Sequence, residues 1–471
     1  MDEHRRRDDL AINLIEVNAH ILGNHSTRSL LSLAAAASEL RVPMTVASVN
    51  GFFPSTRLAL SELRTPAVGG PSRGDLPARL YARGAVLADR CFNGLRRVFP
   101  RSDAPFQLLL IGRCLREAAS LRMAHAATRG THPVPVNVVQ TASESLAASV
   151  AALSRVPHIR LVHEADHFEG PLLGLCEAVC RGRREDVVVV CTRESLKSRL
   201  RKRHPELRAI VKPFTLTDKG MRITEDERKE ARRRLALEPD EVVAALVGGW
   251  WPYKDIATVE RALPIMTERI VLLIVGGPTD DTVIRRMTET SKGRVIVFGK
   301  QVSTDDLRRV YAACNFSLVS RFPGTDKESG LVMDGARYGV PLVVSDSDPA
   351  LKKLLEGHSW VRMFKAGDAV SLSSALDELV ARPLERPGED APSLLEMMTP
   401  IDAIEFFGEL GKWLLGGEPP LSPDGIDAES SFGREEGKER NTLLKAELRD
   451  PSSVPEVADA TAEQAEDGLG T

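Results

Sequence analysis

Short apolar runs alternate with helix-like stretches along most of this 471-residue chain, and this alternation constrains its fold most strongly. The run at 187–190 is four consecutive valines, so that strand is apolar on both faces, as in a sheet covered by helices on both sides. Such alternation is typical of βαβ units and predicts an α/β fold with a mostly parallel sheet. In the first half we expect strands at 11–17, 43–49, 136–140, 158–163, 186–191 and 209–212.

The second half repeats the pattern more clearly. A capping box at 303–306, Ser-Thr-Asp-Asp, predicts the start of one of its helices. Two Rossmann-like lobes are therefore expected, an N-terminal domain at 1–220 and a C-terminal domain at 221–400. The strands expected in the second lobe lie at 242–247, 270–275, 294–298, 315–320, 341–345 and 360–364.

Three further segments organise the chain. A capping box at Thr224 opens a highly charged helix, which we interpret as a solvated linker with i,i+4 ion pairs rather than as a surface for membranes or anionic partners. Residues 401–415 form an amphipathic pattern with Phe406, Phe407, Leu410 and Leu414 on its apolar side. Residues 417–471 contain too few apolar residues to offset the conformational entropy lost on folding, so we predict a disordered acidic tail.

Charge and composition exclude several classes of protein. The 63 Lys and Arg residues against 66 Asp and Glu residues give no basic excess, so we expect no nucleic-acid partner. No apolar run is long enough to span a bilayer, although peripheral membrane contact stays open. The first residues do not resemble a signal peptide, and we expect a cytoplasmic protein. Six cysteines form no disulfide framework, and a zinc site at Cys176 and Cys180 is not favoured.

In parallel sheets, ligands bind beyond the carboxyl ends of the strands, so loops there are the candidate sites. Gly23 and Asn24 follow the first strand and precede a helix, although an ordinary turn would use the same glycine. Gly248, Gly249 and Lys254 follow the first strand of the second lobe, where glycines admit a close ligand and a lysine can contact a diphosphate. There is no Walker loop and no dinucleotide-binding Gly-x-Gly-x-x-Gly motif.

Residues 320–346 carry the most specific signal: a strand, a polar loop with Glu328, a helix opening at Ser329 and Gly330, and a Gly-Val-Pro turn into the next strand. This unit resembles the donor-binding unit of the retaining GT-B glycosyltransferases, the large family 4 group. The resemblance covers roughly 11–415. It implies two lobes facing a cleft, with helix 401–415 crossing back to the first lobe.

The resemblance also implies roles for particular residues. The amide groups of Gly23, Gly248, Ser329 and Gly330, together with Lys254, would hold the diphosphate of a nucleotide sugar. Asn24 would lie in the loop beside the diphosphate and sugar, and Lys300 in the loop that contacts the base. Asp334 would bind the ribose hydroxyls. Glu328 and His163 are the expected catalytic residues, with Glu328 beside the sugar or incoming hydroxyl and His163 orienting the sugar.

Two departures from the family pattern stand out. The family has an arginine where this chain has Gly249, so half of the expected cationic clamp is missing, and Arg321 or Lys300 could compensate. The usual pair of glutamates separated by seven residues is not intact, because Asp334 takes the second position and Glu328 only approximates the first.

We therefore predict a hexosyltransferase-type enzyme that moves a sugar from a nucleoside-diphosphate sugar to an acceptor hydroxyl, with retention, no metal and no cofactor. The alternatives are a non-catalytic nucleotide-binding subunit and a nucleotide-sugar 2-epimerase. The segment His163-Glu-Ala-Asp-His167 satisfies the spacing of a zinc protease. Because that motif requires a helix and His163 is expected to end a strand, we do not favour this interpretation.

Overall fold

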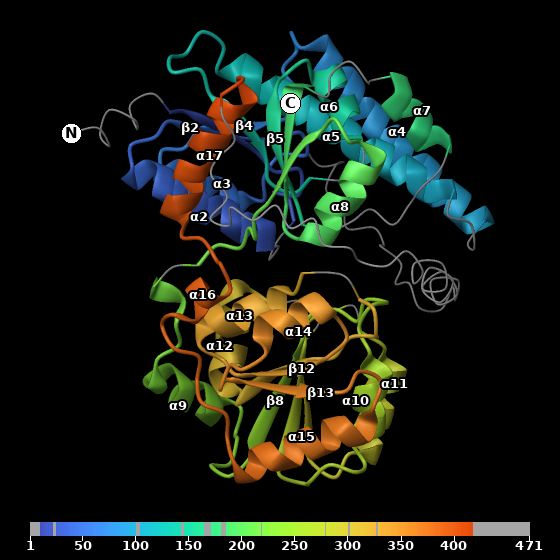
Figure 1. Ribbon diagram of the computed structural model, residues 1–471, viewed down its shortest axis with the longest axis vertical. Helices are drawn as coiled ribbons and strands as arrows, with labels where there is room; N and C mark the ends of the chain where they lie inside the picture. Colours follow the sequence, from blue (N-terminus) through green and yellow to red (C-terminus); the bar gives the residue numbers. More distant parts are fainter. Residues whose placement is uncertain are drawn as a thin grey trace, which may run out of the picture.

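The chain folds into two parallel β-sheets, each covered by helices on both faces, which lie one above the other in Figure 1. The predicted α/β architecture with two Rossmann-like sheets is confirmed. The computed structural model describes residues 10–21, 25–99, 104–142, 146–163, 171–179, 185–217, 219–277, 279–299, 302–325 and 328–417. The acidic tail predicted at 417–471 lies outside the described residues from 418 onward.

The first sheet has seven strands in the order β3-β2-β1-β4-β5-β6-β7. Its four-valine strand behaves as the sequence predicts. Val188 and Val190 pack with one layer of helices, whereas Val187 and Val189 pack with the other. The strands are β1 (Ile12–Ile15), β2 (Met44–Ser48), β3 (Ala67–Gly69), β4 (Val136–Val139), β5 (His158–Val162), β6 (Val187–Cys191) and β7 (Arg208–Val211).

Seven described helices surround this sheet before the chain enters the second lobe. They are α2 (His25–Glu39), α3 (Pro54–Glu62), α4 (Leu76–Val98), α5 (Ala104–Ala127), α6 (Ala147–Ser154), α7 (Pro171–Val179) and α8 (Glu194–Arg203). Our sequence interpretation placed neither the long pair α4 and α5 nor the short edge strand β3. The two long helices pack along each other on the outside of the lobe (Figure 1).

The second sheet has six strands in the order β10-β9-β8-β11-β12-β13, all within one or two residues of the predicted ranges. These strands are β8 (Val242–Val247), β9 (Ile270–Val275), β10 (Val295–Gly299), β11 (Phe316–Val319), β12 (Leu342–Ser345) and β13 (Val361–Phe364). The helices of this lobe are α9 (Glu225–Arg234), α10 (Ile256–Ala262), α11 (Asp281–Thr290), α12 (Thr304–Ala313), α13 (Gly330–Tyr338), α14 (Pro349–Leu355), α15 (Ala369–Ala381) and α16 (Ala391–Leu394).

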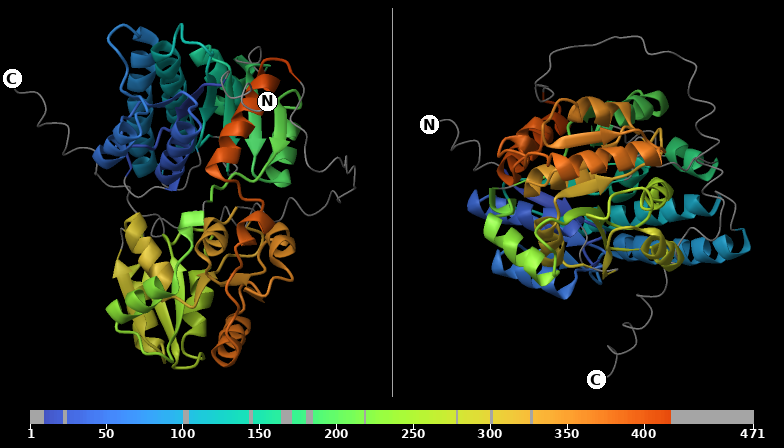
Figure 2. Two further views of the ribbon diagram at one scale, coloured as in Figure 1. Left: turned by 90° about the vertical axis from the view of Figure 1, so that its left-hand side faces the viewer. Right: turned by 90° about the horizontal axis from the view of Figure 1, so that it is seen from below.

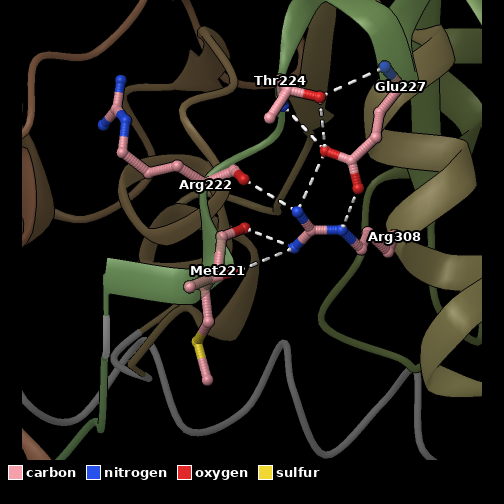
Figure 3. A network of polar contacts seen from close by, with 6 residues as sticks. Met221, Arg222, Thr224, Glu227 and Arg308 are labelled. Carbon is pink, nitrogen blue, oxygen red and sulfur yellow. Dashed lines mark hydrogen bonds and ion pairs between the residues drawn. The ribbon is translucent and has the colours of Figure 1, made fainter.

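The charged linker helix α9 begins with the predicted capping box. The Thr224 hydroxyl accepts a hydrogen bond from the Glu227 amide, and the Glu227 carboxylate accepts one from the Thr224 amide. Arg308 of α12 binds the same carboxylate at 2.7 Å and the carbonyl oxygens of Met221 and Arg222 (Figure 3). Hydrogen bonding from Arg308 lowers the pKa of Glu227 to about 2. This network holds residues 221–227, where the chain enters the second lobe, against α12.

The chain then returns to the first lobe through α17 (Pro400–Leu414), as predicted (Figure 2). Phe407 and Leu410 are completely buried against the first sheet, and Phe406 and Leu414 pack at the edge of the same core. The Phe407 ring stacks on Phe214 with 5.6 Å between centroids. Helix α17, at the C-terminal end of the described chain, is therefore packed into the core of the first lobe.

Among the described residues, no helix combines the length and apolar character needed to cross a bilayer.

Candidate functional site

Residues that follow strands of both sheets contact each other where the lobes meet. His163 comes directly after β5, and Glu328 comes two residues before α13. His163 Nδ1 lies 3.6 Å from Glu328 Oε2, and the two side chains are 31% and 13% exposed. The two residues predicted to be catalytic, 165 positions apart in the chain, are thus brought together from opposite lobes.

The His163 ring is held from its other side as well. Its Nε2 lies 3.3 Å from the carbonyl oxygen of Gln140, just after β4, and the ring edge faces Phe214. A carbonyl oxygen only accepts hydrogen bonds, so Nε2 carries a proton in this contact. The Nδ1 atom faces the Glu328 carboxylate at 3.6 Å, a distance within reach of an ion pair but longer than a hydrogen bond. An imidazole and a carboxylate thus face each other at the centre of the inter-lobe interface.

Glu328 is anchored from two further directions. The Thr215 hydroxyl, on the segment that joins the lobes, lies 3.5 Å from its carboxylate. Arg321, two residues after β11, donates to the Glu328 carbonyl at 3.0 Å. Arg321 is only 4% exposed, and burial lowers the pKa of its guanidinium. This buried cation is one of the two that the sequence offered in place of the missing arginine at Gly249.

Lys254 lies beside the glycines that follow β8. Its Nζ donates to the Val247 carbonyl at 2.7 Å, and its backbone pairs with that of Arg321. Gly248 has a φ of +84°, and a Cβ added there would lie 3.2 Å from Lys254 Nζ. A larger residue at 248 would therefore be strained and would press on the lysine. Gly249 is buried at the same strand end.

The start of α13 lies next to Glu328. The Ser329 hydroxyl caps the helix by accepting a hydrogen bond from the Val332 amide at 3.4 Å. Gly330 is exposed, and a Cβ built on it would meet nothing within 4 Å. Free amide groups and the helix dipole favour an anion at such a position. The predicted helix start at Ser329 and Gly330 is confirmed.

Asp334, predicted to bind ribose, is already engaged by the protein. Its Oδ2 accepts from the Tyr311 hydroxyl at 3.0 Å, and its Oδ1 accepts from Arg337 at 3.0 Å. Arg28, from the first turn of α2 in the other lobe, lies 3.7 Å from Oδ1 and also bonds the Tyr338 hydroxyl at 2.9 Å. Asp334 therefore contributes to the contact between the lobes.

Our sequence interpretation missed Glu16, at the end of β1. This carboxyl group is fully buried, and desolvation raises its pKa, although hydrogen bonds from Thr141 and Asn18 and the nearby charges of Arg113 and His163 oppose the shift. Its position after a strand was a usable signal. Its burial beside His163 could not be read from the sequence, because it depends on how β1, β4 and β5 pair.

A second ion pair across the lobes was also missed. Arg193, after β6, lies 2.7 Å from Asp348 Oδ2. Asp348 also caps α14, where its side chain accepts hydrogen bonds from the amides of Ala350 and Leu351. Within the described part of the chain, no three His, Cys, Asp or Glu side chains gather as metal ligands would.

Several predicted site residues lie outside the described residues, namely Gly23, Asn24 and Lys300. His167 and Cys180 of the two zinc alternatives also lie outside them. The sequence contains one signal that we overlooked: Asp326 is separated from Asp334 by seven residues, the spacing that the resemblance leads us to expect. Asp326 is likewise outside the described residues, so Asp326 and Glu328 are rival candidates for one role.

A pocket of about 360 Å³ lies elsewhere, at the amino ends of β1 and β2. Asn13, Met44 and Thr131 are among its lining residues. It is far in the fold from the carboxyl ends of these strands, where the inter-lobe residues gather. Peptides around this pocket therefore serve as a comparison in the exchange experiment described below.

Two facing Rossmann-like lobes with a returning helix define the GT-B fold, and solved structures confirm this assignment. The Anabaena protein HepE, solved in complex with UDP and glucose, superposes with a TM-score of 0.52 at 12% identity, over 86% of this chain and 99% of that protein. A glycosyltransferase of Rickettsia africae gives a TM-score of 0.56 at 10% identity, over 87% and 100%. At such identities the likeness establishes the fold alone.

Among curated proteins, this chain is similar to a D-inositol 3-phosphate glycosyltransferase of Actinosynnema mirum. The two are 29% identical over 182 residues, which is 34% of this chain and 43% of that relative. The match therefore spans less than half of the relative's length. No protein-family model matches the chain.

Proposed function

We propose that this protein is a glycosyltransferase that uses a nucleoside-diphosphate sugar and binds it between the two lobes. One observation carries the proposal: His163 and Glu328, from opposite lobes, meet at 3.6 Å beyond the carboxyl ends of both sheets. Ligands of open parallel sheets bind at such strand ends. The GT-B fold and the curated relative's activity support the same reaction class.

In this proposal the donor's diphosphate lies near Lys254 and the start of α13. The barrier to sugar transfer is dominated by negative charge that develops on the departing diphosphate. Fixed cations and helix amide groups lower that barrier because they need no reorganisation during the reaction. Lys254, the amides at Ser329 and Gly330 and, through its positive field, the buried Arg321 would supply this stabilisation.

The sugar and the acceptor hydroxyl would lie beside the His163–Glu328 pair. A carboxylate that lies beside an imidazole can accept a proton from an incoming hydroxyl or hold the sugar by hydrogen bonds. The buried carboxyl of Glu16, whose pKa is raised by desolvation, lies close enough to His163 to interact with it electrostatically. We propose that Glu16 contributes to the electrostatic environment of the imidazole, without contacting the substrate.

The finer features belong to the same proposal. A hexosyl donor, retention at the anomeric carbon and a reaction without a bound metal follow from the family resemblance. HepE was solved with UDP and with glucose, so UDP-glucose is the first donor to test. Gly249 in place of an arginine and the engaged carboxylate of Asp334 favour a second candidate, a protein that binds the nucleotide without transferring sugar.

A panel of nucleotide sugars separates these functions. The full chain would be incubated with UDP-, GDP-, ADP- and dTDP-sugars plus a mixed panel of hydroxyl acceptors, and the release of nucleoside diphosphate would be followed. Release with one donor class, together with stabilisation of the fold by the corresponding nucleotide, supports the transferase. Stabilisation without release supports the non-catalytic binder, an epimerised sugar from donor alone supports the epimerase, and no effect of any nucleotide contradicts all three.

A further inference from the structure

Helix α4 carries an apolar stripe on the side that faces away from the protein. Leu76, Leu80, Leu87 and Val98 are between 54% and 67% exposed. At about 100° per residue these four positions fall within about 40° of one another on the helix. The buried residues Ala78, Ala85, Ala88 and Phe92 lie on the opposite side, against the rest of the lobe. The stripe is therefore not part of the core.

A row of arginines runs along one edge of this stripe. Arg83, Arg90 and Arg97 follow one another at intervals of seven residues, so they occupy nearly the same angular position, and all three are exposed. Within the described part of the chain, none of the three donates a hydrogen bond or forms an ion pair. The only acidic residue inside α4 is Asp89, which is bound by Arg116 of α5 at 2.6 Å.

The apolar stripe and the arginine row together indicate the kind of partner that α4 would bind. A helix with exposed leucines along one line and basic residues beside it is typical of helices that lie flat in the interface of a membrane. The 23 residues of α4 span about 34 Å at about 1.5 Å per residue, which gives an extended contact. Each arginine near an anionic surface adds to the attraction, and the leucines add apolar burial.

A second copy of this chain fits the same face less well. A symmetric dimer through α4 would require carboxylates to pair with the arginine row, and the exposed face of α4 supplies none. We propose that α4 is a peripheral membrane-docking surface that binds anionic phospholipid through the stripe Leu76, Leu80, Leu87 and Val98 and the row Arg83, Arg90 and Arg97. This inference does not depend on the proposed transfer reaction.

Co-sedimentation of the full chain with vesicles tests the proposal. We expect binding to vesicles of phosphatidylglycerol mixed with phosphatidylcholine, weaker binding to phosphatidylcholine alone, and loss of the difference at high salt because the arginine contribution is screened. The triple variant Arg83→Gln/Arg90→Gln/Arg97→Gln should bind the anionic vesicles about 100-fold more weakly. The double variant Leu80→Asp/Leu87→Asp should lose a similar factor, since it removes two apolar contacts.

A matched control distinguishes binding through the α4 stripe from nonspecific binding through any exposed apolar residue. The double variant Leu58→Asp/Val370→Asp introduces aspartate at two other apolar positions of similar exposure, on α3 and α15, and should bind vesicles as the wild type does. The absence of vesicle binding, or an equal effect of the control and stripe variants, would overturn the proposal. So would light scattering that shows a dimer which Leu80→Asp/Leu87→Asp converts to a monomer.

Discussion

The contact of 3.6 Å between His163 Nδ1 and Glu328 Oε2 joins the carboxyl ends of the two sheets. It is supported on each side: Gln140 and Phe214 hold the imidazole, and Thr215 and Arg321 hold the glutamate. In the proposed reaction, the donor and the acceptor would meet beside this pair.

We expect Glu328→Gln to lower turnover by about 100-fold while the affinity for the donor changes little, because the amide keeps the shape of the carboxylate but cannot accept a proton. Steady-state kinetics with the active donor would measure this, with Glu356→Gln, an exposed site on the second lobe, as the control. Asp326→Asn tests the rival position. If Asp326→Asn abolishes turnover and Glu328→Gln does not, the assignment to Glu328 is wrong.

Lys254→Met should lower turnover by about 100- to 1,000-fold, the usual effect of removing one preorganised group that stabilises transition-state charge. Methionine keeps the hydrocarbon stem beside Gly248 and removes only the charge and its hydrogen bond to Val247. Lys353→Met, at an exposed position on α14, should have no effect. Unchanged turnover in Lys254→Met would remove the lysine from the proposed mechanism.

Asp334 has two separable roles to test. Removal of its charge leaves the buried Arg337 without its ion-pair partner, so Asp334→Asn should destabilise the fold by about 3 kcal/mol in denaturant titrations. Tyr311→Phe removes one hydrogen bond to the same carboxylate and should cost only about 1 kcal/mol. If Asp334 also binds ribose, Asp334→Asn weakens binding of the nucleoside diphosphate but not of pyrophosphate. Equal effects on both ligands would assign it a structural role alone.

Burial of His158 predicts a loss of stability in acid. This histidine is completely buried at the start of β5, and desolvation followed by the charge of Arg160 lowers its pKa to about 3. Between pH 6.5 and pH 3 the unfolded chain therefore binds a proton that the folded chain does not. Stability falls as the pH falls through this range, by up to about 1.4 kcal/mol per pH unit from this group.

Denaturant titrations at several pH values would show the effect as a slope. The slope should be smaller in His158→Gln and unchanged in His125→Gln, which alters an exposed histidine. Identical slopes in wild type and His158→Gln would contradict the neutral, buried state of this residue.

The fold could be predicted largely because several strands, β8 and β9 among them, are uninterrupted apolar runs. Strands β8 and β9 match their predicted ranges at both ends. Strand β3, by contrast, has only three residues, Ala67–Gly69, and none of them is fully buried, so no apolar run marks it. Helix α5 is buried or half-buried along most of its length, so its sequence shows no single apolar face. Helix α4 carries leucines on its exposed side as well as apolar residues on its buried side.

The site was predictable only where a local motif marks it. Glu328, Ser329 and Lys254 lie in recognisable strand-to-helix loops, and His163 follows an apolar strand. The partners of these residues could not be predicted, because Arg28 with Asp334 and Arg193 with Asp348 are pairs that only the placement of one lobe on the other creates. Likewise, the hydrogen bonds that engage Asp334 follow from the packing of α12 and α13.

Hydrogen–deuterium exchange of the full chain with and without UDP, or whichever nucleotide stabilises it, tests the central claim most directly. The account predicts slower exchange in peptides that cover 247–255 and 328–334, with that protection lost in Lys254→Met. Protection confined to peptides around the pocket at Asn13 and Met44, or no protection by any nucleoside diphosphate, would contradict it.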